Sequence, residues 1–327
     1  MGAEAEAVVT GLVTAMQANF CQVSLDAPGP GGRDRLLCTR RTRLGKAGQH
    51  IHVGDRVGLE GIDWSEGRAA VGVLFPRTSL LGRPPVANCD RIVVVTAMAE
   101  PEPDPEQLSR FLLTAEHSGR PVEVVFSKAD LVPVAQRDSW CARLRGWGYD
   151  PIAISTATGE GLPLLKERLA RPGIAVVCGP SGVGKSSLLN ALVPSLGLRV
   201  GSVSGRLRRG RHTTRHVELF SLASGALIAD TPGFNRPELP ADPRELPGLF
   251  PEIVAALRQG PCRFSNCQHR GDPGCRVGTD WDRYAFYGQG LQELLQARGP
   301  MPDPQRSERG PSRPSRRRQR QQEPDPG

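Results

Sequence analysis

The stretch Ile174 to Leu189, IAVVCGPSGVGKSSLL, decides the fold of this chain. Its first part is apolar and rich in β-branched residues, which predicts a buried strand. Directly after it, Gly179 to Ser186 fills the pattern G-x-x-x-x-G-K-[ST], and the apolar residues that follow predict a helix. A strand, a glycine-rich turn and a helix in this order are typical of a phosphate-binding loop. We therefore expect the chain to bind a nucleoside triphosphate.

Each part of this loop has an expected role. Backbone N–H groups point inward at phosphate oxygens, and the helix that begins near Lys185 adds the positive end of its dipole. Lys185 is expected to reach the β- and γ-phosphates and to act in catalysis, and Ser186 to hold Mg²⁺. A chance glycine-rich turn is the alternative, and the flanking strand and helix argue against it. The predicted nucleotide contacts are Gly179, Pro180, Ser181, Gly182, Val183, Gly184, Lys185, Ser186 and Ser187.

Two further strands end in residues suited to a nucleotide. Downstream, the strand ending at Asp230 continues into D-x-x-G, with Gly233 as its glycine. Asp230 can reach Mg²⁺ through water, and the Gly233 N–H can contact the γ-phosphate. Upstream, the apolar strand that begins at Val122 is followed by Ser127, Lys128, Ala129 and Asp130.

The upstream segment predicts which base is bound. The carboxylate of Asp130 can accept both the N1–H and the exocyclic amino group of guanine, and the stem of Lys128 can lie along the base. Adenine offers no such pair of donors. The predicted ligand is therefore GTP, with GDP as the product.

The order of these motifs is unusual, because the base-recognition segment precedes the phosphate loop. Every motif ends a strand of one sheet, so joining the old termini and cutting elsewhere leaves the site intact. The chain resembles the circularly permuted GTPases, most closely those of small-ribosomal-subunit biogenesis, over about residues 7 to 290. The resemblance implies that Ser155, Thr156 and Ala157 form the loop that closes over the guanine O6. It implies an α/β P-loop GTPase domain flanked by an N-terminal OB-fold barrel and a C-terminal helical zinc-binding domain.

Two positions depart from the expected pattern. Ser127 stands where the family has asparagine, and its shorter side chain is expected to give up contacts to the base and to the phosphate loop, which predicts weaker guanine affinity. Phe234 follows Gly233, where Ras-like enzymes have a water-orienting glutamine. An apolar side chain cannot align a water, so we expect slow intrinsic hydrolysis that a partner completes.

The segment Arg206 to Arg215, RLRRGRHTTR, is highly charged and has no apolar periodicity. Such a loop can be ordered by the γ-phosphate and Mg²⁺ and released on hydrolysis. His212 can position the attacking water once the loop is docked, and the resemblance also implies a histidine here. Thr213 and Thr214 are both expected at the nucleotide. Either can join Ser186 as a Mg²⁺ ligand, and the pattern fits Thr214 as well as its neighbour.

A cysteine cluster near the C-terminus predicts a metal site. Three thiolates and one imidazole suit tetrahedral Zn²⁺, and four protein ligands leave no open position for a water. The predicted zinc is therefore structural, and its binding supplies folding energy to a segment with little core. Its four ligands are Cys262, Cys267, His269 and Cys275. The aromatic and leucine spacing from Trp281 to Leu295 predicts a helix packed on this segment.

The N-terminal region predicts a small barrel. Five short, partly alternating runs are separated by glycine-rich breaks and begin near residues 7, 19, 35, 55 and 69. Five strands of this length suit an OB-fold, a fold that commonly binds oligonucleotides. The basic segment Arg40 to Lys46 is expected to contact RNA phosphates, although a basic loop is often only solvated. Few aromatic residues are present, which favours recognition of backbone and shape.

Bulk properties agree with a cytoplasmic, RNA-associated protein. The chain has 327 residues, a net charge of +8 and eight cysteines, with no signal peptide and no long apolar run. We expect no membrane contact, a monomer, and the small (30S) ribosomal subunit with its rRNA as partner. The basic tail is expected to be disordered. The expected domains are 1–76 (OB-like), 77–240 (GTPase), 241–298 (zinc-binding) and 299–327 (tail).

Two other functions fit parts of this pattern. A metabolic P-loop kinase would transfer the phosphate to a small acceptor, and the guanine-recognition segments argue against it. An RNA-binding protein with zinc and OB domains and a poorly hydrolysing, regulatory nucleotide site is the second alternative. The leading expectation is a GTPase that acts in late maturation of the small subunit and is stimulated by it.

Overall fold

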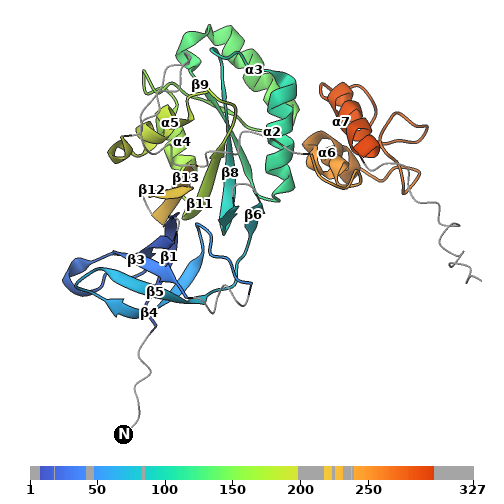
Figure 1. Ribbon diagram of the computed structural model, residues 1–327. Coiled ribbons are helices and arrows are strands. Elements are labelled where there is room, and N and C mark those ends of the chain that lie inside the picture. The colour runs from blue at the N-terminus through green and yellow to red at the C-terminus, as the bar shows by residue number, and fades with distance from the viewer. Residues whose placement is uncertain are drawn as a thin grey trace, which may run out of the picture.

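The computed structural model describes residues 8–17, 19–41, 48–82, 85–197, 217–222, 225–230, 237 and 239–297. Figure 1 shows a strand barrel near the N-terminus, a central sheet flanked by helices, and a smaller helical domain beside α2 (Pro105–His117). The predicted order of barrel, α/β domain and C-terminal helical domain is confirmed. No helix within the described ranges combines the length and the apolarity that crossing a membrane requires.

The N-terminal part is a closed barrel. Its first strand pairs antiparallel with the second and the fourth, and its third pairs parallel with the fifth, so the sheet closes on itself. Val13, Val23 and Val57 have no exposed surface inside it. The five predicted strands are confirmed to within a few residues as β1 (Thr10–Met16), β2 (Phe20–Leu25), β3 (Arg35–Arg40), β4 (Arg56–Asp63) and β5 (Arg68–Leu74).

The central sheet runs in the order β10, β9, β8, β11, β13, β12. Neighbouring strands are parallel except for β12, which is antiparallel to β13. The carboxyl ends of the parallel strands therefore meet at one edge, where ligands of open α/β sheets bind. The strands are β8 (Cys89–Ala97), β9 (Val122–Ser127), β10 (Ile152–Ala153), β11 (Gly173–Cys178), β12 (Glu218–Ser221) and β13 (Ala226–Asp230).

Helices cover both faces of this sheet. Along β8, Ile92 and Val94 belong to an apolar cluster with residues of α2 and α3, whereas Val93 and Val95 belong to a cluster with residues of α4 and α5. Burial on both faces explains why these strands are almost continuously apolar. The remaining helices of this domain are α3 (Val134–Gly146), α4 (Leu162–Leu169) and α5 (Lys185–Leu192), and α5 begins at Lys185, as the phosphate-loop motif predicts.

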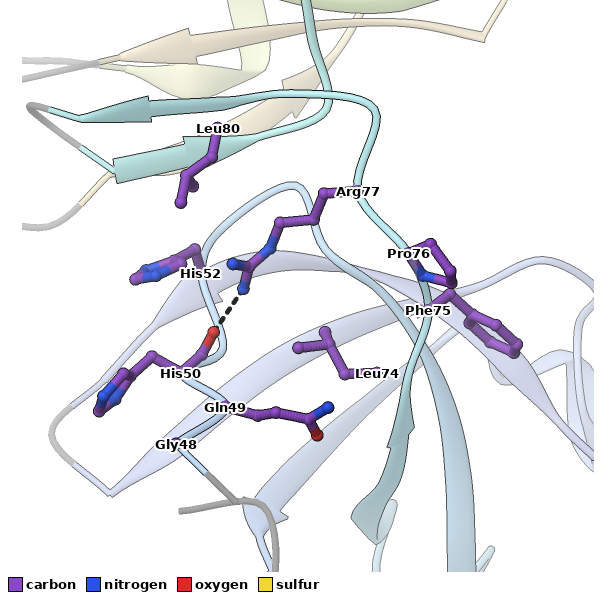
Figure 2. A pocket seen from close by; sticks show the side chains of 9 residues that line it. All are labelled: Gly48, Gln49, His50, His52, Leu74, Phe75, Pro76, Arg77 and Leu80. Atoms are coloured by element: carbon purple, nitrogen blue, oxygen red, sulfur yellow. Dashed lines mark hydrogen bonds between the residues drawn. The ribbon is translucent and has the colours of Figure 1, made fainter. Parts of the chain in front are cut away.

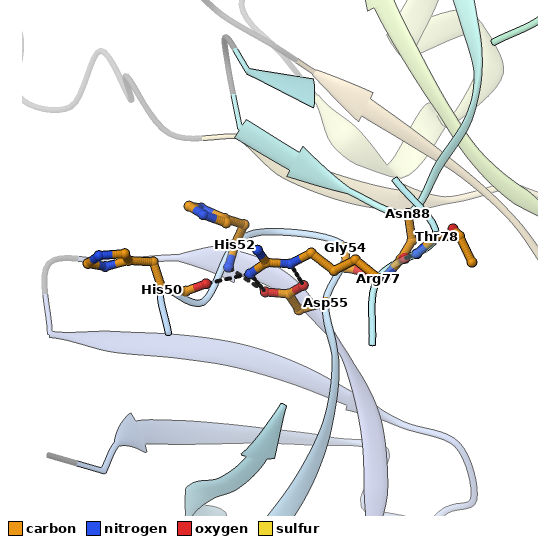
Figure 3. A network of polar contacts seen from close by, with 7 residues as sticks. All are labelled: His50, His52, Gly54, Asp55, Arg77, Thr78 and Asn88. Carbon is orange, nitrogen blue, oxygen red and sulfur yellow. Dashed lines mark hydrogen bonds and ion pairs between the residues drawn. The ribbon is translucent and has the colours of Figure 1, made fainter. Parts of the chain in front are cut away.

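A polar joint fixes the barrel to the central domain (Figure 3). Asn88, directly before β8, donates its amide to the Gly54 carbonyl at 2.8 Å and accepts the Thr78 backbone N–H at 2.8 Å. The Ala87 N–H donates to the Val53 carbonyl at 2.8 Å. A Cβ at Gly54 would lie 2.0 Å from the Ala87 oxygen, so only glycine permits this approach. The backbone of the barrel at Val53 and Gly54 therefore packs directly against the backbone of Ala87, just before the central sheet begins.

Asp55 forms the buried centre of this joint. Its side chain has no exposed surface, and its two oxygens accept hydrogen bonds from Arg77 Nε at 2.7 Å and Nη2 at 2.8 Å. The His52 backbone N–H adds a third at 2.7 Å, and Arg77 also donates to the His50 carbonyl. Arg77 follows β5 on the way to the central domain, so this pair connects the barrel wall to the linker.

An open pocket of about 540 Å³ lies next to the joint (Figure 2). It belongs to the junction between the barrel and the hairpin of β6 (Leu80–Gly82) and β7 (Pro85–Ala87). Among the residues that the structure describes, none predicted to bind the nucleotide lines it. Its lining consists of Gly48, Gln49, His50, His52, Leu74, Phe75, Pro76, Arg77 and Leu80.

The C-terminal domain packs α6 (Pro251–Arg258) and α7 (Tyr284–Ala297) around Phe250 and Tyr287, which have no exposed surface. Asp282 joins it to the end of α3. This carboxylate accepts hydrogen bonds from Arg143 Nε at 2.6 Å, from Arg143 Nη2 at 2.9 Å and from Trp147 Nε1 at 2.7 Å. The bonds from Arg143 lower the pKa of Asp282, so the contact is an ion pair at neutral pH.

The buried pair of Asp55 with Arg77 leads to a prediction for the stability of an arginine variant. Arg77→Ala leaves the fully buried Asp55 carboxylate without its cation, so the free energy of unfolding should fall by about 3–5 kcal/mol. Arg41→Ala is the matched control, because its pair with Glu60 is partly exposed at 3.4 Å and contributes less than about 1 kcal/mol. Urea denaturation of both variants measures the difference. Equal stability of the two would contradict the structural role of Arg77.

Candidate functional site

The phosphate loop leaves the carboxyl end of β11 and enters α5, as predicted. Gly179 has a φ of 141°, and a Cβ there would lie 2.0 Å from the Val95 carbonyl oxygen of β8. Gly184, the N-cap of α5, has a φ of 86°. Both positions therefore favour glycine for steric and conformational reasons. The first turn of α5 carries Ser186 and presents its N–H groups toward this edge of the sheet.

The side chain of Lys185 folds back over the loop. Its Nζ donates hydrogen bonds to the carbonyl of Gly179 at 2.8 Å and to that of Pro180 at 2.5 Å. These bonds hold the ammonium at the mouth of the loop, next to the N-terminus of α5. A cation and a helix N-terminus in one place form an environment suited to phosphate oxygens.

The base-recognition segment starts at the carboxyl end of the neighbouring strand β9. Lys128 adopts a left-handed conformation with φ of 55° and donates from Nζ to the Glu100 carbonyl. The Ala129 N–H donates to the Ile154 carbonyl at 3.0 Å. These contacts turn the chain so that Asp130, in a short 3-10 turn, is exposed. Its carboxylate is thus accessible to a ligand at this edge.

Ser127 connects the base-recognition segment to the phosphate loop. The residue is 2% exposed, and its hydroxyl donates to the Val183 carbonyl at 2.5 Å, with the Thr96 carbonyl 3.3 Å away. The expectation that serine gives up contact with the phosphate loop is therefore wrong. β9 and β11 lie on either side of β8, and this brings the end of β9 close enough to the loop for a short side chain to span the distance.

The third predicted segment lies beside the second. Ser155 has no exposed surface, and its Oγ accepts the N–H groups of Ala157 at 3.2 Å and Thr158 at 3.1 Å. Arg137 of α3 binds Glu160 at 2.5 Å and so ties this loop to α3, while the Ala129 N–H bond to the Ile154 carbonyl joins it to the base-recognition segment. Thr156 and Ala157 are exposed. The structure therefore brings residues 127–130, 155–157 and 179–187 to one edge of the sheet.

Some predicted site residues are not among the described ones. The structure describes Asp230 only as the end of β13, where its backbone pairs with Val177 of β11. The residues His212, Thr213, Thr214 and Gly233 lie outside the described ranges. Sequence reasoning missed the carbonyl groups of Glu100, Val183 and Ile154, since a backbone acceptor carries no residue-specific signal.

The cysteine cluster is assembled as its spacing predicts. The Sγ of Cys262 lies 3.5 Å from His269 Nδ1, and that of Cys275 lies 3.7 Å from it. With Cys267 included, all four ligand atoms lie within 4.8 Å of one another. Zn–S bonds near 2.3 Å and Zn–N bonds near 2.0 Å imply S···N edges of about 3.5 Å in a tetrahedron. The donor set and its spacing therefore fit a tetrahedral metal such as zinc.

Surrounding groups support this cluster. The Arg276 N–H donates to Cys262 Sγ at 3.2 Å, an interaction that stabilises a thiolate. Burial lowers the pKa of His269, which keeps the imidazole in the neutral form that ligates metals. Tyr287 of α7 donates to the Gln268 carbonyl at 2.6 Å. The predicted packing of a C-terminal helix on the metal segment is thereby confirmed.

Comparison with known proteins identifies the family. The RsgA GTPase family model matches residues 74–240. A relative in Synechococcus sp. (strain CC9605), named small ribosomal subunit biogenesis GTPase RsgA, is 55% identical over 293 residues, covering 90% of this chain and 96% of the relative. A relative of the same name in Parasynechococcus marenigrum (strain WH8102) is 56% identical over 283 residues, covering 86% and 95%. This chain belongs to the RsgA GTPase family.

Solved structures agree with this assignment. YjeQ from Thermotoga maritima has a TM-score of 0.73 and 30% identity, covering 88% of this chain and 98% of that one. YloQ, described as a circularly permuted GTPase, has a TM-score of 0.71 and 27% identity, covering 92% and 99%. Membership of the RsgA GTPase family makes the chain a ribosome-biogenesis GTPase with the permuted motif order predicted from sequence. The kinase alternative is thereby excluded.

Ser127 leads to a prediction for nucleotide affinity in this GTPase. Ser127→Ala removes the hydrogen bond to Val183 and leaves a buried carbonyl with one partner fewer, so GTP should bind about five- to twenty-fold more weakly. Ser118→Ala is the control, because it removes another 2.5 Å hydroxyl-to-carbonyl bond, at the end of α2. Fluorescent GTP titration measures both. An unchanged dissociation constant for Ser127→Ala would show that the bond does not position the loop.

Proposed function

We propose that this chain hydrolyses GTP to GDP and phosphate at the edge formed by residues 127–130, 155–157 and 179–187, and that it acts in late maturation of the small ribosomal subunit. The hydrogen bond from Ser127 to Val183 carries this proposal. It brings a base-recognition segment and a phosphate loop, far apart in sequence, within one nucleotide's length of each other. A purine triphosphate can span both.

The proposal gives each residue a role. Lys185 and the N–H groups of the phosphate loop neutralise the β- and γ-phosphates, and Asp130 accepts the two N–H donors of guanine. Ser127, Lys128 and Ala129 position that carboxylate, and Ser155, Thr156 and Ala157 close over the O6. Mg²⁺, which GTPases use with GTP, would be held by Ser186, by Thr213 or Thr214, and through water by Asp230. There it would offset the charge that develops on the phosphate oxygens.

Hydrolysis also needs an oriented water. Phe234 cannot supply the hydrogen bond that a glutamine would, so His212 is proposed to position the water once its loop docks on the nucleotide. The small subunit would stabilise that docked arrangement, which makes hydrolysis a signal for release. The Gly233 N–H would contact the γ-phosphate in the same arrangement.

The proposed partner is the 30S subunit with its rRNA. The relatives named above carry small ribosomal subunit biogenesis in their name, and the chain has a net charge of +8. The barrel, with Arg40 to Lys46, and the basic tail would contact rRNA phosphates. We propose the domain division 1–76, 77–240, 241–298 and 299–327, supported by the end of β5 at Leu74 and the family match over 74–240.

A cytoplasmic location and a monomer complete the proposal. All eight cysteines have free thiols, which agrees with a reducing compartment. Zinc would bind Cys262, Cys267, His269 and Cys275 as a structural ion, since three thiolates and an imidazole fill its four positions. The alternative function, an RNA-binding protein with a regulatory, poorly hydrolysing nucleotide site, is favoured only by Phe234.

Steady-state GTP turnover with and without purified 30S particles tests the function. Turnover should rise by at least ten-fold with the subunit. Lys185→Ala should reduce it by more than 100-fold, because the phosphate charge loses its cation. Asp130→Asn should abolish the preference for GTP over ATP, since an amide cannot accept both guanine donors. Absence of stimulation by 30S in the parent chain would favour the regulatory alternative.

Metal analysis tests the zinc proposal. The purified chain should contain about one zinc per molecule, and Cys275→Ala should lose it because only three ligands remain. The segment from Cys262 to Cys275, which the structure describes in full, has no buried apolar cluster of its own, so this variant should unfold at a lower temperature. Cys141→Ala is the control, since Cys141 lies in the core of the GTPase domain and should keep the full metal content. A parent chain that unfolds at the same temperature with and without zinc would contradict the proposal.

A further inference from the structure

Phe264 is an exposed aromatic residue on the metal-binding segment. Its side chain is 52% exposed, although burying an aromatic ring is favourable. The residue lies between Cys262 and Cys267, the first two predicted ligands, and no described element covers it. A single exposed apolar side chain is common at protein surfaces, so it is the charged groups beside this ring that indicate an interaction site.

The loop beneath Phe264 is well anchored. The Cys267 N–H donates to the Phe264 carbonyl at 3.2 Å, which closes a turn. The Arg263 N–H donates to the Gly274 carbonyl at 3.0 Å, and a Cβ at Gly274 would lie 2.8 Å from that of Arg263. The two strands of chain around the metal cluster are therefore in close contact. The backbone that carries the ring is thus fixed before a partner binds, which lowers the entropy cost of binding.

One arginine contacts the ring, and two more lie near it in sequence. The Arg263 guanidinium lies over the face of Phe264, with Cζ 5.4 Å from the ring centroid. Arg270 and Arg276 belong to the same segment, whereas Asp272 is its one acidic residue. Within the part of the chain that the structure describes, no carboxylate forms an ion pair with any of these three arginines. Arg276 donates to the Gln259 carbonyl at 3.1 Å, a neutral acceptor that leaves its charge uncompensated, so the positive charge of this segment can attract a polyanion.

We propose that Phe264 and Arg263 form a stacking platform for an unpaired nucleotide of RNA. A base would stack on the free face of the Phe264 ring, while Arg263, with Arg270 and Arg276, would contact the adjoining phosphates. Stacking on an aromatic ring accepts any base, so the platform selects single-stranded over double-stranded RNA and not one sequence. This inference rests on the proposed function, because it names the form of rRNA that the C-terminal domain would bind.

Binding of labelled RNA to the full-length chain tests the platform. Fluorescence anisotropy compares a single-stranded octanucleotide with a duplex of the same length over a range of salt concentrations. Phe264→Ala should weaken single-strand binding at least five-fold and leave the salt dependence unchanged, because stacking releases no counterions. Phe264→Trp should bind at least as tightly as the parent. Arg263→Gln should reduce the salt slope by about one.

Two controls keep this test decisive. Leu295→Ala truncates another exposed apolar side chain of the same domain, 39% exposed, and should leave RNA binding unchanged. Phe264→Leu keeps an apolar side chain without a π face and should lose affinity as Phe264→Ala does. If Phe264→Ala loses its zinc, Phe264→Leu with full zinc content decides the outcome.

Several results would overturn the platform. One is that Phe264→Ala changes the dissociation constant for the single-stranded octanucleotide by less than two-fold. A second is that it weakens binding of the duplex as much as binding of the single strand. A third is that it weakens binding to 30S particles and leaves binding to the oligonucleotide unchanged. The last result would assign Phe264 to a protein surface of the subunit. Failure of the parent chain to respond to 30S in GTP turnover would instead contradict the proposed function, whatever Phe264 does.

Discussion

The structure depends on one geometric constraint, the common direction of the strands β8 to β11 and β13. Because these strands are parallel, every segment that leaves a carboxyl end emerges at the same edge of the sheet. The order in which the chain visits the strands then has no effect on the site. Ser127 and Val183 are 56 residues apart, yet one hydrogen bond joins them across the end of β8. Circular permutation preserves the site for this reason.

The sequence predicts those elements that depend on residues close together in the chain. The phosphate loop, the alternating strands of the barrel and the cysteine spacing all depend on residues within about 20 positions of one another, and all have the expected form. Features that depend on packing between distant segments were not predictable. Gly54 is required because Ala87 approaches it from another domain, and Ser127 keeps the contact that its short side chain was expected to lose.

The barrel and the GTPase sheet are continuous through β12. This strand pairs with β13, which ends at Asp230, and at Glu218 it also pairs with Ala15 of β1. In the sequence, β12 follows Arg206 to Arg215, the charged segment expected to be ordered by the γ-phosphate and Mg²⁺. The barrel is therefore joined by backbone pairing to the strand between that segment and Asp230.

Both flanking domains are oriented by charged groups in addition to apolar contacts. Asp55 with Arg77 lies at the barrel joint. Arg143 with Asp282 lies at the C-terminal joint, where Arg283, 2% exposed, also stacks 4.7 Å from the Trp147 ring centroid. A buried ion pair adds little net stability, but separating its partners costs about 3–5 kcal/mol. Another docking angle of the barrel would break the buried pair of Asp55 with Arg77, and another angle of the C-terminal domain would separate Asp282 from Arg143 and Arg283 from Trp147. These pairs therefore fix where the two domains stand relative to the nucleotide edge.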